Sequence, residues 1–168
     1  MEETTRFEIV PMDRAHLDRA EALERLCFPE DPWSRQIFEE ALADSTAVNL
    51  AAVGPDGALL GYVNCNIVLD EGDVGNVAVH PDCRRQGVAS ALLEAFRRIG
   101  EEKQLDHIML MVRKTNAPAR ELYARCGYVD VGVRKNYYLH PREDAIYMRL
   151  ELHNDKQNSD TGRTEANF

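Results

Sequence analysis

The sequence lacks any long hydrophobic run, and this absence excludes membrane-spanning helices. Its apolar stretches are only a few residues long, whereas a helix needs about 20 apolar residues to cross a bilayer. The opening residues, MEETTRFEIV, are acidic and polar, and a secretory signal would instead be basic and then apolar. We therefore expect a cytoplasmic protein with no membrane partner.

Cysteine is scarce and is not arranged for metal binding. The chain has four cysteines and five histidines. The cysteines stand at positions 27, 65, 83 and 126, with no CxxC pair and no metal-ligand spacing to the histidines. The sequence predicts reduced thiols and no metal site.

An excess of positive charge is also missing. Lys and Arg total 20 against 29 Asp and Glu, which gives a formal net charge of −9. Proteins that bind nucleic acid neutralise its phosphates with basic side chains, so we expect no direct nucleic-acid partner. The hydrophobic content of 44% and the charged content of 29% are typical of a globular protein.

The chain shows neither an internal repeat nor a Pro/Gly/Ser-rich linker within residues 1–152. Its 168 residues match the size of one ordinary domain. From residue 153 onward, HNDKQNSDTGRTEANF has no aliphatic periodicity. We predict one domain over 1–152 and a flexible polar tail over 153–168. The sequence does not fix the oligomeric state, and a monomer is the default expectation.

Hydrophobic periodicity predicts alternating strands and helices. Strands are expected at 7–10, 47–53, 58–69, 74–79, 107–112, 128–138 and 143–152, with helices at 13–26, 33–43, 88–99 and 116–127. Asp13 and Asn116 are candidate helix caps. The first helix is expected to bury Ala15, Leu17, Ala20, Leu23 and Leu26 along one face. This order predicts an α/β (α+β) fold, with a mixed sheet and helices on both faces.

The stretch Arg84-Arg85-Gln86-Gly87-Val88-Ala89 has the chemistry of an anion site. It opens the helix expected at 88–99, and the first N–H groups of a helix lack intrahelical partners and carry partial positive charge. Gly87 leaves room for a ligand to approach the backbone, and the arginines add charged donors. The spacing fits neither a Walker A loop nor the GxGxxG fingerprint. The alternative is a helix start with solvated basic residues.

The pattern Arg84-x-x-Gly87-x-Ala89, followed about thirty residues later by NAPARELYARCGY, resembles the GNAT superfamily of acetyl-CoA-dependent N-acetyltransferases. The stretches CFPEDPWS, NVAVHPDCRRQGVASALL, LMVRKTNAPARELYARCGY and NYYLHPREDAIYM are similar to the bacterial ribosomal-protein-alanine N-acetyltransferases and related Nα-acetyltransferases. The resemblance covers residues 6–152. It implies a mostly antiparallel sheet with one splayed pair of strands.

The resemblance also implies how acetyl-CoA binds. Backbone groups of one splayed strand pair with the pantetheine arm, the turn that follows holds the pyrophosphate, and an asparagine helps to position the cofactor. These roles correspond to Val77, Ala78 and Val79 for the strand, to Arg85, Gln86, Gly87, Val88, Ala89 and Ser90 for the turn, with Arg84 at its edge, and to Asn116.

Tyr123 matches the tyrosine that the family places near the acetyl sulfur. When an amine attacks the thioester, the departing thiolate needs a proton, and a nearby phenol can supply it. The alternative is a tyrosine that only packs on the buried face of its helix.

The general base is harder to assign, because bacterial relatives usually carry a glutamate in an LEVR sequence and this chain has LMVR. The thioether of Met111 is too weak an acceptor to replace a carboxylate. Glu30, in FPED, resembles a glutamate of archaeal and eukaryotic relatives, and Asp73 is a second candidate that would act through water. The alternatives are solvated loop charges, with solvent taking the proton.

Tyr137 and Tyr138, with REDA following, match a hairpin loop that relatives use to hold the first residues of a peptide. Packing at a strand end is the alternative. We therefore expect an enzyme that acetylates the N-terminal α-amine of a protein, with a ribosomal protein as one candidate. Acetylation of a lysine or small amine, and a weakly active acyl-CoA-binding protein, are the alternatives.

Overall fold

A computed structural model describes residues 6–152, so the polar tail predicted at 153–168 lies outside the described residues. The strands are β1 (Glu8–Pro11), β2 (Ala47–Val53), β3 (Leu59–Val68), β4 (Glu71–Val79), β5 (His107–Arg113), β6 (Val129–Leu139) and β7 (Arg142–Glu151). The α-helices are α1 (Leu17–Cys27), α2 (Arg35–Ala43), α3 (Val88–Glu102) and α4 (Ala117–Arg125). Every strand and helix expected from the sequence is present.

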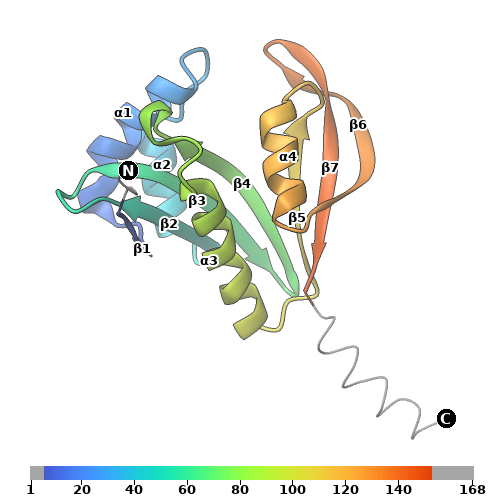
Figure 1. Cartoon of the computed structure of the whole chain (residues 1–168), viewed down its shortest axis with the longest axis horizontal. Helices are drawn as coiled ribbons and strands as arrows, with labels where there is room; N and C mark the ends of the chain where they lie inside the picture. Colours follow the sequence, from blue (N-terminus) through green and yellow to red (C-terminus); the bar gives the residue numbers. More distant parts are fainter. Residues whose placement is uncertain (1–5, 153–168) are drawn as a thin grey trace, which may run out of the picture.

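The strands form one seven-stranded sheet in the order β1-β2-β3-β4-β5-β7-β6. All neighbouring strands are antiparallel except β4 and β5, which run parallel. Figure 1 shows α1 and α2 on one face of the sheet and α3 on the other. Within residues 6–152, no helix combines the length and the apolarity that crossing a membrane requires.

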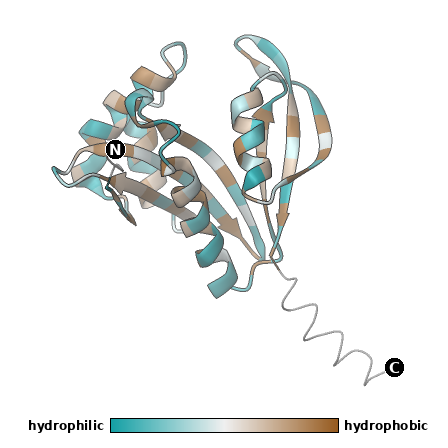
Figure 2. Cartoon of the chain, in the orientation of Figure 1, coloured by the Kyte–Doolittle hydropathy of each residue, from teal (hydrophilic) through white to brown (hydrophobic). Residues whose placement is uncertain are grey.

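Helix α3 covers one face of the sheet because its apolar residues recur at helical spacing. Val88, Leu92, Leu93 and Phe96 are almost completely buried. They join one hydrophobic cluster with the inward side chains of β2, β3, β4, β5 and β7. Figure 2 shows the contrast between these largely hydrophobic strands and the hydrophilic outer surface of α3. This packing fixes where the N-terminus of α3 meets the end of β4.

A second cluster forms beneath α1 and α2 on the opposite face. Leu17, Ala20 and Leu23 are buried there, as the sequence predicts. The prediction is wrong for Ala15, which is exposed in a short 3-10 turn before α1, and for Leu26, which is 53% exposed. The buried face of α1 instead continues through a carboxylate, as described below.

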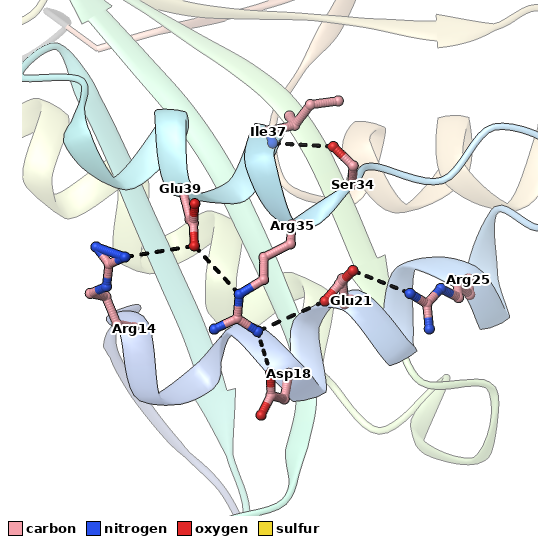
Figure 3. Close-up of polar contacts among 8 residues, drawn as sticks. All are labelled: Arg14, Asp18, Glu21, Arg25, Ser34, Arg35, Ile37 and Glu39. Carbon is pink, nitrogen blue, oxygen red and sulfur yellow. Dashed lines mark hydrogen bonds and ion pairs between the residues drawn. The ribbon is translucent and has the colours of Figure 1, made fainter.

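Ion pairs join α1 to α2 across the loop that connects them (Figure 3). Arg35 pairs with Asp18 and Glu21 of α1 and with Glu39 of its own helix. Ser34 caps α2 by accepting a hydrogen bond from the Ile37 N–H at 3.3 Å. Helix α2 therefore begins at Arg35 and not at Trp33, and the loop between the two helices is anchored at both ends.

Candidate active site

The parallel strands β4 and β5 pair only along Glu71–Val74 and then separate. Beyond that point β4 stays paired with β3 as far as Val79, and β5 stays paired with β7 as far as Arg113. The register with β3 shifts by one residue at Gly75, as in a β-bulge, which bends a strand away from its neighbour. Among the described strands, none lies on the β5 side of residues 75–79, so this edge can pair with an extended ligand.

The turn between β4 and α3 presents backbone N–H groups at a helix N-terminus. Arg85 has φ +65° and Gly87 has φ +82°, both in the left-handed region, and alternating left-handed residues form anion-binding concavities. Gly87 is the N-cap of α3 and makes no side-chain capping bond. A Cβ built on Gly87 would meet no heavy atom within 4 Å. The positive end of α3 therefore faces open space.

The side chains of this turn do not all face that space. Arg84 lies back over the end of β4, where its Nε donates to the Val79 carbonyl at 3.4 Å and its Nη2 lies 3.9 Å from Cys27 Sγ. Gln86 Nε2 donates to the Asp82 carbonyl at 3.3 Å. Arg85 is exposed, so its guanidinium is available to a ligand at the turn.

Two of the expected cofactor residues can contribute only backbone groups, because their side chains are buried. Ala78 is 2% exposed and packs under α1, and Val88 is 1% exposed and packs under α3. Val77 and Val79 are half-buried in the α3 cluster. Ala89 and Ser90 follow in the first turn of α3 and are partly accessible. Binding of acetyl-CoA by this strand and turn stays a prediction.

Helix α4 begins close to the separated end of β5. Asn116 caps it, accepting a hydrogen bond from the Ala119 N–H at 3.2 Å. Tyr123 packs edge-on against Tyr128, with their ring centroids 6.1 Å apart. Burial raises the pKa of Tyr123 to about 12, and the phenol of Tyr138 adds to this shift. Tyr123 therefore keeps its proton at neutral pH and lies near the β6–β7 hairpin.

The two hairpin tyrosines stand at the end of β6, next to the turn into β7. Tyr137 and Tyr138 contact each other edge-on, with ring centroids 5.0 Å apart. The guanidinium of Arg113 lies 4.3 Å above the Tyr138 ring, and that of Arg134 lies 5.6 Å above the Tyr137 ring. Figure 1 shows this hairpin and the α1–α2 loop at the same end of the molecule, on either side of the separated strands.

The three positions considered for the general base are in different surroundings. Met111 lies on the part of β5 that has separated from β4. Asp73 lies on β4 opposite Met109, and although it is exposed, neighbouring atoms raise the pKa of its carboxyl by desolvation. Glu30 is exposed in the α1–α2 loop. None of the three is a buried carboxylate.

A buried carboxylate that the sequence analysis missed lies beneath β4. Glu24 is 1% exposed and accepts hydrogen bonds from the Tyr62 hydroxyl, from Asn76 Nδ2 at 3.2 Å and from the Trp33 N–H at 3.1 Å. Glu24 stands seven residues after Leu17 and four after Ala20, a spacing that places all three on one helix face. This spacing was the available sequence signal for its burial. The network ties α1 and the α1–α2 loop to the strand segment 75–79.

The described part of the chain holds no cluster of metal ligands at this site. Within residues 6–152, no three His, Cys, Asp or Glu side chains gather closely enough to hold a metal ion. The thiol of Cys27 donates to the Val79 carbonyl at 3.4 Å, and burial raises its pKa. The site therefore consists of a main-chain cradle, a protonated tyrosine and an aromatic hairpin.

Comparison with known proteins agrees with this architecture. The sequence pattern of the Acetyltransferase (GNAT) family matches residues 17–128. Ribosomal protein bS18-alanine N-acetyltransferase of Escherichia coli K12 is 35% identical over 123 residues, which cover 72% of this chain and 82% of the relative. The enzyme of the same description from Haemophilus influenzae is 37% identical over 124 residues, covering 72% and 83%.

A solved structure is similar over an even larger share of the chain. The crystal structure of the ribosomal-protein-S18-alanine N-acetyltransferase from Escherichia coli superposes with a TM-score of 0.79 at 32% identity, covering 88% of this chain and 94% of that one. The fold and the family resemblance expected from the sequence are thus confirmed. The chain belongs to the acetyltransferase (GNAT) family and is an acetyl-CoA-dependent N-acetyltransferase.

Proposed function

We propose that this enzyme acetylates the N-terminal α-amine of a protein, and that its acceptor is ribosomal protein bS18. The names of the relatives at 35% and 37% identity support this acceptor. A ribosomal acceptor also implies that the reaction takes place in the cytoplasm. The observation in the molecule that carries the proposal is the aromatic pair Tyr137 and Tyr138 on the hairpin that lies across the separated strands from the α1–α2 loop (Figure 1).

In this proposal acetyl-CoA lies between the separated strands. Main-chain groups of Val77, Ala78 and Val79 pair with its pantetheine arm, and the turn from Arg85 to Ser90 holds its pyrophosphate at the N-terminus of α3, with Arg84 at the edge of the turn. Arg85 and the N–H groups around Gly87 supply most of the contact, because Arg84 is engaged with Val79. Asn116 places the start of α4 beside the thioester.

Tyr123 acts as the general acid. The thioester of acetyl-CoA supplies the acetyl group, and its sulfur leaves as a thiolate that needs a proton. The phenol of Tyr123 is protonated at neutral pH and can donate to that sulfur. The hairpin residues Tyr137 and Tyr138 hold the first residues of the acceptor beside it.

The acceptor itself relieves the need for a strong base. An α-amine has a pKa of roughly 7.7 to 8.0 and is about a tenth neutral at pH 7, whereas a lysine near 10.4 is almost wholly charged. With Met111 where relatives carry a glutamate, Glu30 or Asp73 assists through water. Loss of a positioned base costs about 10² to 10⁴ in rate, so turnover at pH 7 is expected to be slow.

Thiol release from acetyl-CoA tests the proposed acceptor. The panel contains a peptide with the N-terminal sequence of bS18, the same peptide with a blocked N-terminus, and a blocked peptide with an internal lysine. Turnover on the free N-terminus alone is expected. Turnover on the blocked lysine peptide would refute the proposal, and cofactor binding without turnover on any amine would favour an acyl-CoA-binding protein, as Met111 permits.

The same assay separates the two candidate bases. Glu30→Gln is expected to lower kcat/KM at pH 7 more than Asp73→Asn does, because Glu30 belongs to the loop beside the acceptor. Each variant keeps the size of the side chain and removes only its basicity. Equal and small effects would remove both residues from the mechanism and leave solvent as the proton acceptor.

A further inference from the structure

Arg113, at the end of β5, holds the turn of the β6–β7 hairpin. Its Nη1 donates to the Pro141 carbonyl at 2.9 Å, and its Nη2 donates to the His140 carbonyl at 3.0 Å. The same guanidinium lies 4.3 Å above the ring of Tyr138. One side chain therefore fixes both the path of the turn and the orientation of an aromatic ring beside it.

A second set of bonds joins the hairpin to the start of α4. Glu143 accepts hydrogen bonds from the Thr115 N–H at 2.6 Å and from Thr115 Oγ1 at 2.5 Å, and it pairs with Arg113 Nη1 at 3.3 Å. The Lys114 N–H donates to the Asp144 carbonyl at 3.0 Å. These donors lower the pKa of Glu143, so the carboxylate stays charged and keeps the link closed at neutral pH.

The consequence of these contacts is a fixed distance between hairpin and acid. Arg113 lies two residues beyond Met111 on β5, and the residues that follow it lead into α4, which carries Tyr123. Tyr138 lies near enough to Tyr123 for its charge to influence the pKa of that phenol. Movement of the hairpin would therefore change the position of Tyr138 relative to the reacting sulfur.

We propose that Arg113 is a positioning residue for the acceptor: it orients Tyr138 and the hairpin turn so that the N-terminus of the peptide is presented to the thioester. This role rests on the proposed function, since it concerns a peptide held at Tyr137 and Tyr138. Arg113 does not touch the reacting atoms and acts through Tyr138 and the turn carbonyls.

The contacts explain why an arginine is required at this position. A planar guanidinium can stack on an aromatic ring while its edge donates to two carbonyls and one carboxylate. A lysine ammonium is a compact charge that can reach one carbonyl but cannot stack in this way. Arg113→Lys should therefore restore only part of what Arg113→Gln loses.

Steady-state kinetics with the bS18 peptide measures the role of Arg113. Arg113→Gln is expected to raise the KM for the peptide about tenfold while kcat falls less than about threefold, because the lost contacts position the acceptor and not the acid. The KM for acetyl-CoA should stay within about twofold. The peptide KM of Arg113→Lys should lie between those of the unmodified enzyme and Arg113→Gln. An unchanged peptide KM would refute the role. An equal rise in the KM values for peptide and acetyl-CoA, together with a lowered Tm, would also refute it.

Arg149 provides a matched control. Its side chain is 32% exposed against 29% for Arg113, and it also lies in ion pairs, with Glu151 and Asp106. These partners lie near the start of β5 and the end of β7, far from the turn of the β6–β7 hairpin. Arg149→Gln should leave both KM values unchanged, and a similar rise in peptide KM would show that Arg113→Gln acts through general loosening of the fold.

Amide hydrogen exchange separates failure of this inference from failure of the proposed function, because it needs no acceptor. Arg113→Gln should speed exchange across 136–143 and leave α3 unchanged. Slow exchange in the variant would refute the bracing itself. If the unmodified enzyme acetylates no peptide N-terminus, the proposed function fails and the positioning role falls with it, even where exchange is faster.

Discussion

Tyr123 is the side chain on which the proposed proton transfer depends. Tyr123→Phe removes the donor and keeps the ring that packs on Tyr128. We expect kcat to fall about 10² to 10⁴-fold, the usual contribution of a positioned acid. The KM for acetyl-CoA should hardly change, because the phenol contacts the sulfur only as it leaves. An unchanged kcat would end the assignment of Tyr123 as the acid.

The pH dependence of the reaction follows from the same residue. As pH rises, kcat/KM should increase through the pKa of the acceptor amine, roughly 7.7 to 8.0, and then level off. An ordinary tyrosine, with a pKa of 10.0, would lose its proton next, but burial raises the pKa of Tyr123 to about 12. The plateau should therefore extend to about pH 11. A decline that begins near pH 9 in a rate profile would contradict this account.

We expect the side chain at position 111 to set the rate at neutral pH. Met111→Glu places a carboxylate at the position where relatives carry their glutamate, and the peptide-dependent rate at pH 7 should rise by about tenfold to a hundredfold. The gain should shrink above about pH 8, where the amine is already neutral. In Met111→Gln the glutamine has a size and polarity similar to those of glutamate but no basicity, so this variant should show no gain. Equal rates for the two variants would show that no base is needed here.

At the level of elements, the turn into α3 depends on the backbone conformation of Gly87. Gly87→Ala forces a side chain into φ +82°, which costs about 1 to 2 kcal/mol, and it places a methyl group in front of the helix N-terminus. We expect a lower Tm and a KM for acetyl-CoA raised about tenfold.

Gly132 is the control for that substitution. It also has open space around a built Cβ, but its φ lies outside the left-handed region. Gly132→Ala should leave the KM for acetyl-CoA and the Tm nearly unchanged. If both variants behaved alike, the turn at Gly87 would have no special part in binding the cofactor.

The sequence predicted most elements because their signals are local. The stripe that begins at Val88 and the cap at Asn116 need only neighbouring residues to be recognised. Strand β4 was expected from 74 and begins at Glu71, because pairing with β3 and β5 extends it through polar residues. The first helix buries Glu24 in place of Leu26, since the polar partners of Glu24 come from distant strands.

At the site too, the contacts that the sequence did not predict join residues that are distant in sequence. Gly87 and the two arginines before it, Arg84 and Arg85, predict an anion site within one hexapeptide. The link from Arg113 to the hairpin joins residues 27 and 28 positions apart, and nothing in either segment alone indicates it. Local chemistry therefore predicted the cofactor turn, whereas the bonds from Arg113 to the hairpin turn became visible only in the folded molecule.

Across the whole molecule, Glu24 joins α1 and the α1–α2 loop to strands β3 and β4. Glu24→Ala would leave the buried Tyr62 hydroxyl and the Trp33 N–H without their acceptor, and Asn76 Nδ2 would keep only its bond to the Tyr62 oxygen. We expect a loss of about 3 kcal/mol in the free energy of unfolding, measured by urea denaturation. Asp18→Ala, on the exposed side of α1, should cost less than about 1 kcal/mol. Similar losses would show that the buried network is not a structural link.

Mass spectrometry of the intact acceptor shows directly whether the enzyme acetylates the N-terminus of bS18. Purified bS18 is incubated with the enzyme and acetyl-CoA, and tandem fragmentation locates any added acetyl group. We expect one acetyl group, on the N-terminal amine, and no modified lysine. Acetylation confined to lysine side chains, or an unmodified bS18 under conditions where the enzyme binds acetyl-CoA, would contradict this expectation.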